Sequence, residues 1–166
     1  MTIAIRRARP DDAAFLVALT EHDDVDPFLA AGRDQSPEAM AADIARSEST
    51  PDEFGIFIIE AAGESVGTMR FELANRRSRI ANLSQLAVHP ASRGRGVADK
   101  AGRLFQRHLI DDLGFHRLQL EVYAFNERAL AHAERVGYTR EGVRRKAYRG
   151  EDGWIDGIMF GLVAED

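Results

Sequence analysis

The sequence predicts an α/β fold in which a mixed central sheet of about seven strands carries helices on both faces. The first observation is the order of the segments, because strand and helix patterns follow one another as βααβββαβαββ. The second is composition: 166 residues with 45% hydrophobic and 30% charged residues are typical of one globular domain with a sizeable core. We therefore expect a single domain over residues 1–166.

Seven segments have the residue pattern of strands, either as alternation of apolar and polar residues or as short apolar runs. They are residues 2–8, 54–61, 65–73, 79–89, 116–125, 138–149 and 154–163. Turns are expected at Ala62-Gly63-Glu64 and at 75–78. Asp152-Gly153, between the last two strands, is a strong hairpin signal.

Four segments have the pattern of helices: residues 10–20, 37–47, 94–113 and 127–136. Pro10 opens the first, and Ser36 is an N-cap ahead of Pro37 at the start of the second. The third has an apolar stripe at helical spacing and ends at Gly114. Residues 21–35 indicate a loop or short helical turns.

The most informative segment is the glycine-rich turn between the strand 79–89 and the helix that follows it. Backbone N–H groups at the start of a helix lack intrahelical partners, and the helix dipole adds positive potential there. Gly94 and Gly96 allow a phosphate to approach the backbone closely, and Arg93 and Arg95 add charge. We therefore expect a site for a cofactor that carries a pyrophosphate.

Two common phosphate-binding patterns do not fit this turn. A Walker A loop needs a Gly-Lys-Ser/Thr ending, which is absent, and the dinucleotide fingerprint needs a third glycine where Asp99 stands. The pattern that fits is Arg-x-x-Gly-x-Ala, formed by Arg93, Gly96 and Ala98. It resembles the acetyl-coenzyme A signature of the GNAT N-acetyltransferase superfamily.

A second segment strengthens the resemblance. The strand pattern 118–125 ends at Asn126, and the helix after it closes at Gly137-Tyr138. This order is similar to the family's strand, asparagine, helix and closing glycine-aromatic pair. The resemblance covers residues 54–164 and is greatest to the branch that acetylates the N-termini of ribosomal proteins.

The resemblance implies a GNAT-like, splayed sheet and acetyl-coenzyme A as cosubstrate. Backbone groups of Leu86 and Val88 would contact the pantetheine, and the Val88 N–H would polarise the thioester carbonyl, while both side chains can still pack in the core. Asn126 is expected to cap a helix and reach the cofactor. Arg128 lies near the phosphates or is a plain exposed helix residue. The implied cofactor-binding positions are Leu86, Ala87, Val88, Arg93, Gly94, Arg95, Gly96, Val97, Ala98, Asn126 and Arg128.

Glu121 is the expected general base, since relatives with this motif carry a catalytic glutamate there. The alternative is a solvent-facing or ion-paired glutamate on the sheet. The family's usual proton donors are missing, because Ala133 and Ala129 stand at their positions. Tyr148 is the candidate acid, with Tyr123 and water as alternatives. A thiolate is weakly basic, so a dedicated acid is not essential.

The acceptor is expected to be a primary amine, such as a protein N-terminus, a polyamine or an aminoglycoside. The acidic segment 21–26 follows the first helix. It is either a negative lip that attracts a cationic acceptor or an ordinary acidic loop. A competing hypothesis for the whole chain is an acyl-coenzyme A-binding sensor or partner module without chemistry.

Composition excludes several other classes. With no cysteine there is no disulfide framework or thiolate nucleophile, and the five scattered histidines do not have metal-ligand spacing, so no metal is expected. The net charge of −5 argues against a nucleic-acid binder, including an RNA-binding module that uses the arginine clusters. No apolar run approaches membrane-spanning length. We expect a cytoplasmic protein without a membrane partner; homodimerisation is common among relatives, but the residues do not decide it.

Overall fold

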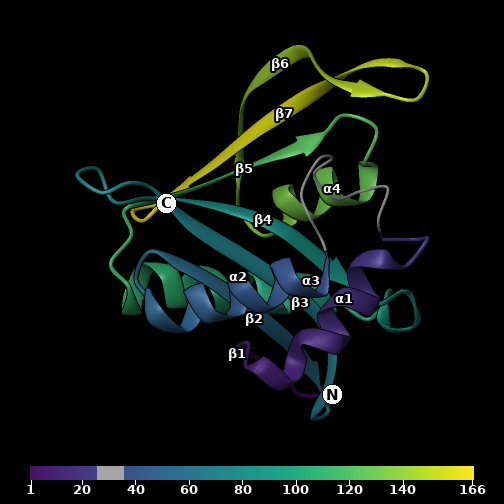
Figure 1. The fold of residues 1–166 in the computed structure, drawn as a ribbon. Coiled ribbons are helices and arrows are strands. Elements are labelled where there is room, and N and C mark those ends of the chain that lie inside the picture. Colours follow the sequence, from purple (N-terminus) through teal and green to yellow (C-terminus); the bar gives the residue numbers. More distant parts are fainter. Residues whose placement is uncertain (26–35) are drawn as a thin grey trace.

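The computed structural model describes residues 1–25 and 36–166. One seven-stranded sheet runs through the molecule in the order β1-β2-β3-β4-β5-β7-β6 (Figure 1). Its strands are β1 (Ile3–Arg7), β2 (Phe54–Ala61), β3 (Glu64–Asn75), β4 (Ile80–Val88), β5 (Arg117–Tyr123), β6 (Thr139–Gly150) and β7 (Gly153–Val163). Neighbouring strands are antiparallel except β4 and β5, which are parallel, so the sheet is mixed as predicted.

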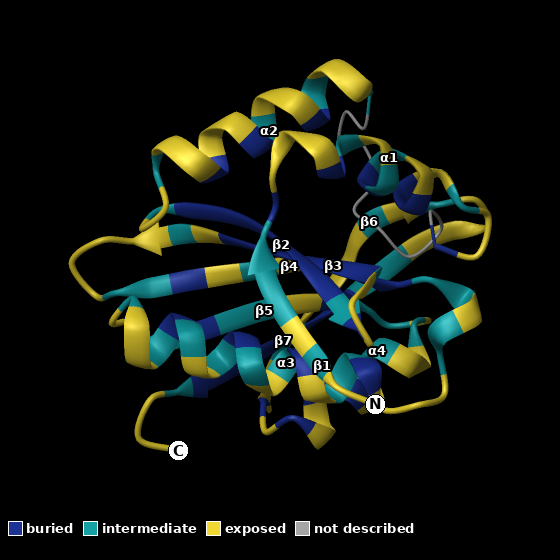
Figure 2. Cartoon of the chain, turned by 90° about the horizontal axis from the view of Figure 1, so that it is seen from below, coloured by how far each residue is buried: buried dark blue, intermediate teal, exposed yellow. Residues whose placement is uncertain are grey.

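Helices cover both faces of the sheet, which confirms the predicted fold class. They are α1 (Ala13–Glu21), α2 (Pro37–Ser49), α3 (Val97–Arg107) and α4 (Glu127–Arg135). Figure 2 shows α1 and α2 on one side and α3 and α4 on the other. The alternation of β2 explains this: Ile56 and Ile58 pack with α1 and α2, whereas Phe57 and Ile59 pack with α3.

The third helix starts later than the predicted range 94–113. Gly94 and Gly96 have φ values of 80° and 72°, and this left-handed backbone belongs to a turn, so the regular helix begins at Val97. At its other end the helix passes into a π-helical turn, His108–Asp112, before Gly114 ends it as predicted.

The first predicted helix, 10–20, is a short 3-10 turn, Pro10–Asp12, followed by α1. In the predicted loop 21–35, residues 22–25 form a bend and turns, and residues 26–35 lie outside the described part of the chain. Among the described residues, no helix is both long and apolar enough to cross a membrane.

Candidate active site

The sheet opens between β4 and β5. The two strands pair only from Ile80 to Asn82 on β4 and from Arg117 to Gln119 on β5, and beyond these residues they separate. A cleft of about 660 Å³ occupies the opening and is lined by both strands, α3, α4, β6 and β7. The separation confirms the splayed sheet that the resemblance implied.

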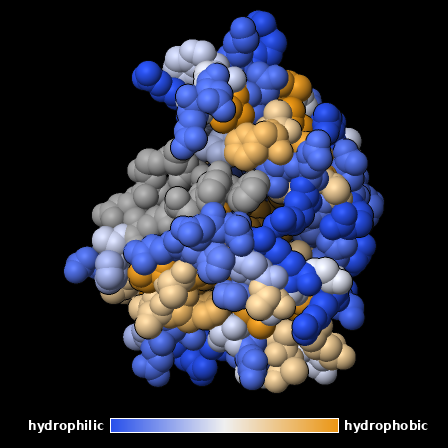
Figure 3. Space-filling model, turned by 90° about the vertical axis from the view of Figure 1, so that its right-hand side faces the viewer, coloured by the Kyte–Doolittle hydropathy of each residue, from blue (hydrophilic) through white to orange (hydrophobic). Residues whose placement is uncertain are grey.

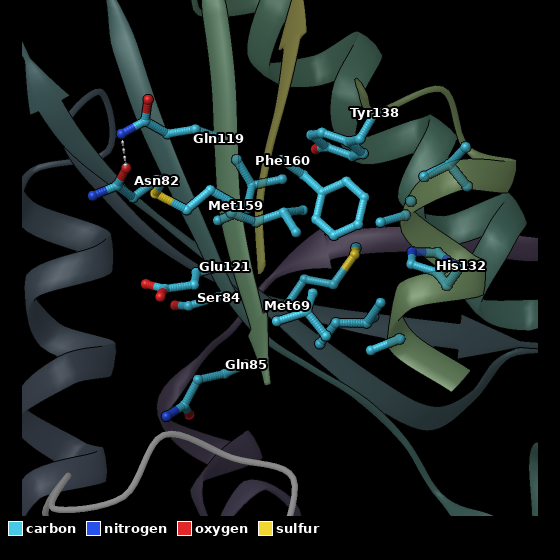
Figure 4. Close-up of a pocket in the computed structure, with 18 of the residues that line it drawn as sticks. Met69, Asn82, Ser84, Gln85, Gln119, Glu121, His132, Tyr138, Met159 and Phe160 are labelled. Atoms are coloured by element: carbon cyan, nitrogen blue, oxygen red, sulfur yellow. Dashed lines mark hydrogen bonds between the residues drawn. The ribbon is translucent and has the colours of Figure 1, made fainter. Parts of the chain in front are cut away.

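The cleft reaches both faces of the sheet. Figure 4 shows Glu121 and Ser84 on one side of β5, with Phe160, Tyr138 and His132 on the other. In Figure 3, which views the molecule from the right-hand side of Figure 1, hydrophobic atoms lie in a recess among hydrophilic side chains. The cleft can therefore hold a long ligand with an apolar middle.

The end of β4 directs backbone groups toward this opening. Gln85 has a φ of 55°, and the register of β4 against β3 shifts beside it, as in a β-bulge. Further along, the His89 N–H donates to the Val66 carbonyl at 2.7 Å. Since bonded and non-bonded pairs alternate in an antiparallel ladder, Val88 turns its N–H and carbonyl away from β3, toward the gap.

The three predicted β4 residues differ in position. Leu86 is 36% exposed and lines the cleft. Ala87 and Val88 are buried and do not belong to its lining. Ala87 packs in a small cluster with Leu19 and Val25, and Val88 packs in the core beneath α3. Any ligand contact of Val88 therefore has to come from its backbone.

The glycine-rich turn carries the features of an anion site. At Gly94 and Gly96 an added Cβ would meet no atom within 4 Å, so the backbone is open to solvent. Val97 is buried and anchors the first turn of α3, whereas Ala98 is half-buried. The N–H groups of that turn precede the first possible i→i−4 bond, so they are available to an anion.

The two arginines of the turn have different surroundings. The Arg93 guanidinium donates to the carbonyl of Val88 at 3.2 Å and to the carbonyl of Asp24 at 3.0 Å, which ties the glycine-rich turn to β4 and to the turn after α1. Burial lowers the pKa of Arg93, and the nearby Arg128 adds to this effect. Arg95 is exposed. Charge for a phosphate is therefore accessible on Arg95, while Arg93 holds the turn in shape.

Helix α4 packs beside α3 and lines the cleft from its N-cap onward. Asn126 lines the cleft and is the N-cap of α4, accepting from the Ala129 N–H at 3.2 Å, which confirms its predicted capping role. Arg128 is exposed on the first turn of α4. The electrostatic effect of Arg128 on Arg93 indicates that the two helix starts lie near each other.

An ion-pair network joins α3 to α4. Asp99 contacts Arg135 Nε and His132 Nδ1, both at 2.7 Å. The contact with Arg135, and then that with His132, lowers the pKa of Asp99 to about 2. His132 is buried against Gly102, and burial lowers its pKa. The network fixes the spacing of the two helices, both of which line the cleft.

Glu121 and Tyr148 meet at the other face of the sheet. The Tyr148 hydroxyl donates to Glu121 Oε1 at 2.6 Å, and Arg144 Nε lies 3.6 Å from Glu121 Oε2. Between them runs β7, where a Cβ on Gly157 would lie 2.0 Å from Glu121 Oε2. The glycine leaves the space that the carboxylate occupies. Glu121 is therefore both paired, as the alternative interpretation expected, and in the lining of the cleft.

Tyr148 remains protonated over the ordinary pH range. Burial and the hydrogen bond to Glu121 raise its pKa to about 12. Its ring also packs edge to face against Tyr123, with the ring centres 5.1 Å apart. A hydroxyl with such a pKa transfers its proton poorly to a thiolate, whose conjugate acid titrates near ~8.5. Its direct contact is with the expected base.

Several cleft residues were not singled out by the sequence reasoning. Gln119 donates to Asn82 at 2.7 Å across the last paired residues of β4 and β5. Arg117 is paired with Glu141 through two contacts. Gln85 is buried, and its Nε2 has no hydrogen-bond partner among residues 1–25 and 36–166. The only available signal was that Asn82, Gln119 and Glu121 alternate onto one face of their strands.

Two further groups from the sequence are the histidines and the acidic segment 21–26. Over the two described ranges, no three His, Asp or Glu side chains gather as a metal site. In the acidic segment 21–26, His22 packs edge to face against His89, with the ring centres 5.3 Å apart. Asp26 lies outside the described residues. Whether this segment steers a cationic acceptor stays a prediction.

Known proteins share this fold and sequence pattern. The family model of the acetyltransferase (GNAT) domain matches residues 2–139. An uncharacterised N-acetyltransferase, YokL, from the SPbeta prophage of Bacillus subtilis is 28% identical over 115 residues, which are 69% of this chain and 64% of that protein. The ribosomal protein bS18-alanine N-acetyltransferase of Salmonella typhimurium is 38% identical over 85 residues, 49% of this chain and 55% of that protein.

Solved structures agree with the fold. RimJ of Mycobacterium smegmatis, in complex with CoA-disulfide, has a TM-score of 0.84 at 22% identity, covering 98% of this chain and 82% of that one. The chain spans about 64% and 55% of the lengths of the two curated relatives named above. The family model nevertheless covers most of the sequence and includes the turn 93–98 and Glu121. The chain belongs to the GNAT acetyltransferase family.

Proposed function

We propose that this protein transfers the acetyl group of acetyl-coenzyme A to a primary amine by direct attack. The observation that carries the proposal is the placement of Glu121 in the cleft between β4 and β5, on the far side of the sheet from α3 and α4. Acetyl-coenzyme A supplies a thioester as the acetyl donor. The chain must then hold this donor, remove a proton from the amine and exclude competing water.

The glycine-rich turn, which lies outside the lining of the cleft, and the cleft itself both have features that fit a coenzyme A thioester. The α3 turn offers free N–H groups, Gly94 and Gly96 leave the backbone open, and Arg95 adds an exposed charge for a pyrophosphate. The unpartnered Nε2 of Gln85 is a buried donor in the lining, which a ligand carbonyl could satisfy. Val88 would hold the carbonyl of the donor through its N–H, as an oxyanion hole does.

Glu121 is the proposed general base. A protonated amine cannot attack, so a proton must leave first, directly to the carboxylate or through water. Tyr148 is proposed to hold the carboxylate in place, and its hydroxyl remains a candidate donor to the leaving thiolate alongside Tyr123 and water. Because residues 129 and 133 are alanines, the leaving thiolate is protonated by one of these groups or leaves without a dedicated acid.

The acceptor and the assembly are also proposals. The curated bS18 relative acts on a ribosomal-protein alanine, which supports a protein N-terminus as one acceptor class. Polyamines and other small amines form the other class. We further propose a cytoplasmic location, in keeping with the absence of cysteine, and leave a homodimer as a prediction.

The test is release of free thiol from acetyl-coenzyme A in the presence of a panel of amines: ribosomal-protein N-terminal peptides, polyamines, aminoglycosides and amino acids. Thiol release that depends on the amine supports the proposal. Tight binding of acetyl-coenzyme A by calorimetry, without release for any amine, would favour the sensor alternative. Absence of binding would contradict the assignment of the turn 93–98 as the cofactor site.

A further inference from the structure

The carboxylates in the lining of the cleft are balanced by arginines. Among the described residues that line the cleft, the carboxylates are Glu121 and Glu141. Each is matched by an arginine, since Arg144 lies beside Glu121 and Arg117 is paired with Glu141. A polyamine carries several ammonium groups that need surplus carboxylates, whereas this lining offers none.

Arg117 and Arg144 differ in how many of their guanidinium nitrogens have a hydrogen-bond partner among the described residues. Arg117 is engaged through both terminal nitrogens with Glu141 and through Nε with Gln119 at 3.1 Å. Arg144 uses only its Nε, which contacts Met159 Sδ at 3.4 Å, and its side chain is 60% exposed. Within residues 1–25 and 36–166, its terminal nitrogens have no hydrogen-bond partner. Because Arg144 lines the cleft, four N–H donors that lack an acceptor within these residues can bind a ligand there.

The register of the strands brings these donors to the reacting centre. Arg144 pairs with Gly157 across β6 and β7, and the Glu121 carboxylate fills the space above the same glycine. Arg144 Nε is 3.6 Å from Glu121 Oε2. An oxygen bound by the Arg144 guanidinium therefore lies within a few ångströms of an amine that gives its proton to Glu121.

We infer that the acceptor is an α-amino carbonyl compound, meaning the N-terminus of a peptide or an amino acid derivative, and that Arg144 binds its carbonyl or carboxylate oxygen. The nitrogen and carbonyl oxygen of one residue are about 3 Å apart by covalent geometry. Glu121 and Arg144 can then hold the two at once. The planar guanidinium fork suits this oxygen, and a polymethylene amine has none to offer. The inference rests on the proposed acetyl transfer.

A matched pair of small amines tests the inference. L-alaninamide and isopropylamine have similar shapes, but only the first has a carbonyl beside its amine. Thiol release from acetyl-coenzyme A is measured for both with the wild type, with Arg144→Ala and with Arg77→Ala. Arg77 is an exposed residue of the β3–β4 turn outside the cleft, so it controls for loss of surface charge.

Arg144→Ala is expected to raise KM for alaninamide about tenfold or more, the usual effect of losing a charged hydrogen bond. It should change KM for isopropylamine less than about twofold. Arg77→Ala should leave KM for both amines unchanged. Comparing each variant with the wild type on the same amine removes the difference in amine basicity. Arg144→Lys, which keeps the charge without the fork, should recover only part of the loss.

The wild type is also expected to acetylate a tetrapeptide with a free N-terminal alanine more efficiently than spermidine. Equal effects of Arg144→Ala on both small amines would overturn the inference, because Arg144 would then act only on Glu121. A preference of the wild type for spermidine would overturn it as well. In either case amine acetylation itself would stand. A wild type that releases thiol with no amine at all would instead contradict the proposed function.

Discussion

The Tyr148 hydroxyl donates to the Glu121 carboxylate at 2.6 Å, and the two side chains meet across β7. They come from β5 and β6, which are not neighbours in the sheet, and Gly157 on β7 leaves the gap in which they touch. The hydrogen bond holds Oε1 of the proposed base, while Oε2 lies near Arg144. Three strands therefore contribute to the position of one carboxylate.

Tyr148→Phe removes this hydrogen bond and keeps the ring. Because a hydrogen bond to a charged group contributes about 1.5–3 kcal/mol, we expect kcat to fall about tenfold while the Kd of acetyl-coenzyme A stays unchanged. The pKa of Tyr148 is raised to about 12, so the wild type should show no loss of rate from tyrosine ionisation at pH 10, where an ordinary tyrosine titrates. A wild-type kcat in Tyr148→Phe would remove Tyr148 from the reaction.

Gly157→Ala tests the space that the carboxylate occupies. An added Cβ would lie 2.0 Å from Glu121 Oε2 and 2.8 Å from the Tyr148 ring, so one of these side chains must move. We expect kcat to fall tenfold or more, since small displacements of a base are costly, while acetyl-coenzyme A binding by calorimetry is retained. Unchanged kcat with an intact fold by circular dichroism would show that the observed position of Glu121 is not required.

The two arginines of the glycine-rich turn should have separable effects. Arg95→Ala removes an exposed charge, so we expect weaker acetyl-coenzyme A binding, a smaller effect at high salt, and an unchanged melting temperature. Arg93→Ala removes the bonds to the carbonyls of Val88 and Asp24, so it should also lower the melting temperature. The same response to salt and the same stability in both variants would contradict this division.

Asp99→Asn tests the link between α3 and α4. The partners of Asp99 depress its pKa from 3.8 to about 2, so its contribution to folding is present above pH 4 and is lost as the pH falls through about 2. We expect the variant to be less stable by about 2 kcal/mol at pH 7, with the difference shrinking between pH 4 and pH 2. Urea unfolding across this range measures it, and a pH-independent difference would contradict the account.

Much of the fold follows from local patterns in the sequence. The strand ranges 54–61 and 154–163, the cap at Ser36 and the hairpin at Asp152-Gly153 agree with the structure because each depends on neighbours in the chain. The start of α3 was placed three residues too early, since helical periodicity does not reveal that Gly94 and Gly96 adopt left-handed backbone.

The site was less accessible from sequence, because its contacts join distant strands. Asn126 as a helix cap could be predicted from its place after a strand. That Tyr148 contacts Glu121, or that Arg144 lies beside it, depends on the order β5-β7-β6 and on the shift of register in β6 before Tyr148. The backbone partners of Arg93 could not be predicted either, because an arginine in a phosphate-binding pattern indicates charge and not its partners.

The most direct test of the central claim is a comparison of the wild type with Glu121→Gln, which keeps the shape of the side chain and removes its basicity. We predict that kcat for an accepted amine falls about a hundredfold or more, the usual contribution of a general base, while the Kd of acetyl-coenzyme A is unchanged. Undiminished turnover in Glu121→Gln would contradict the account.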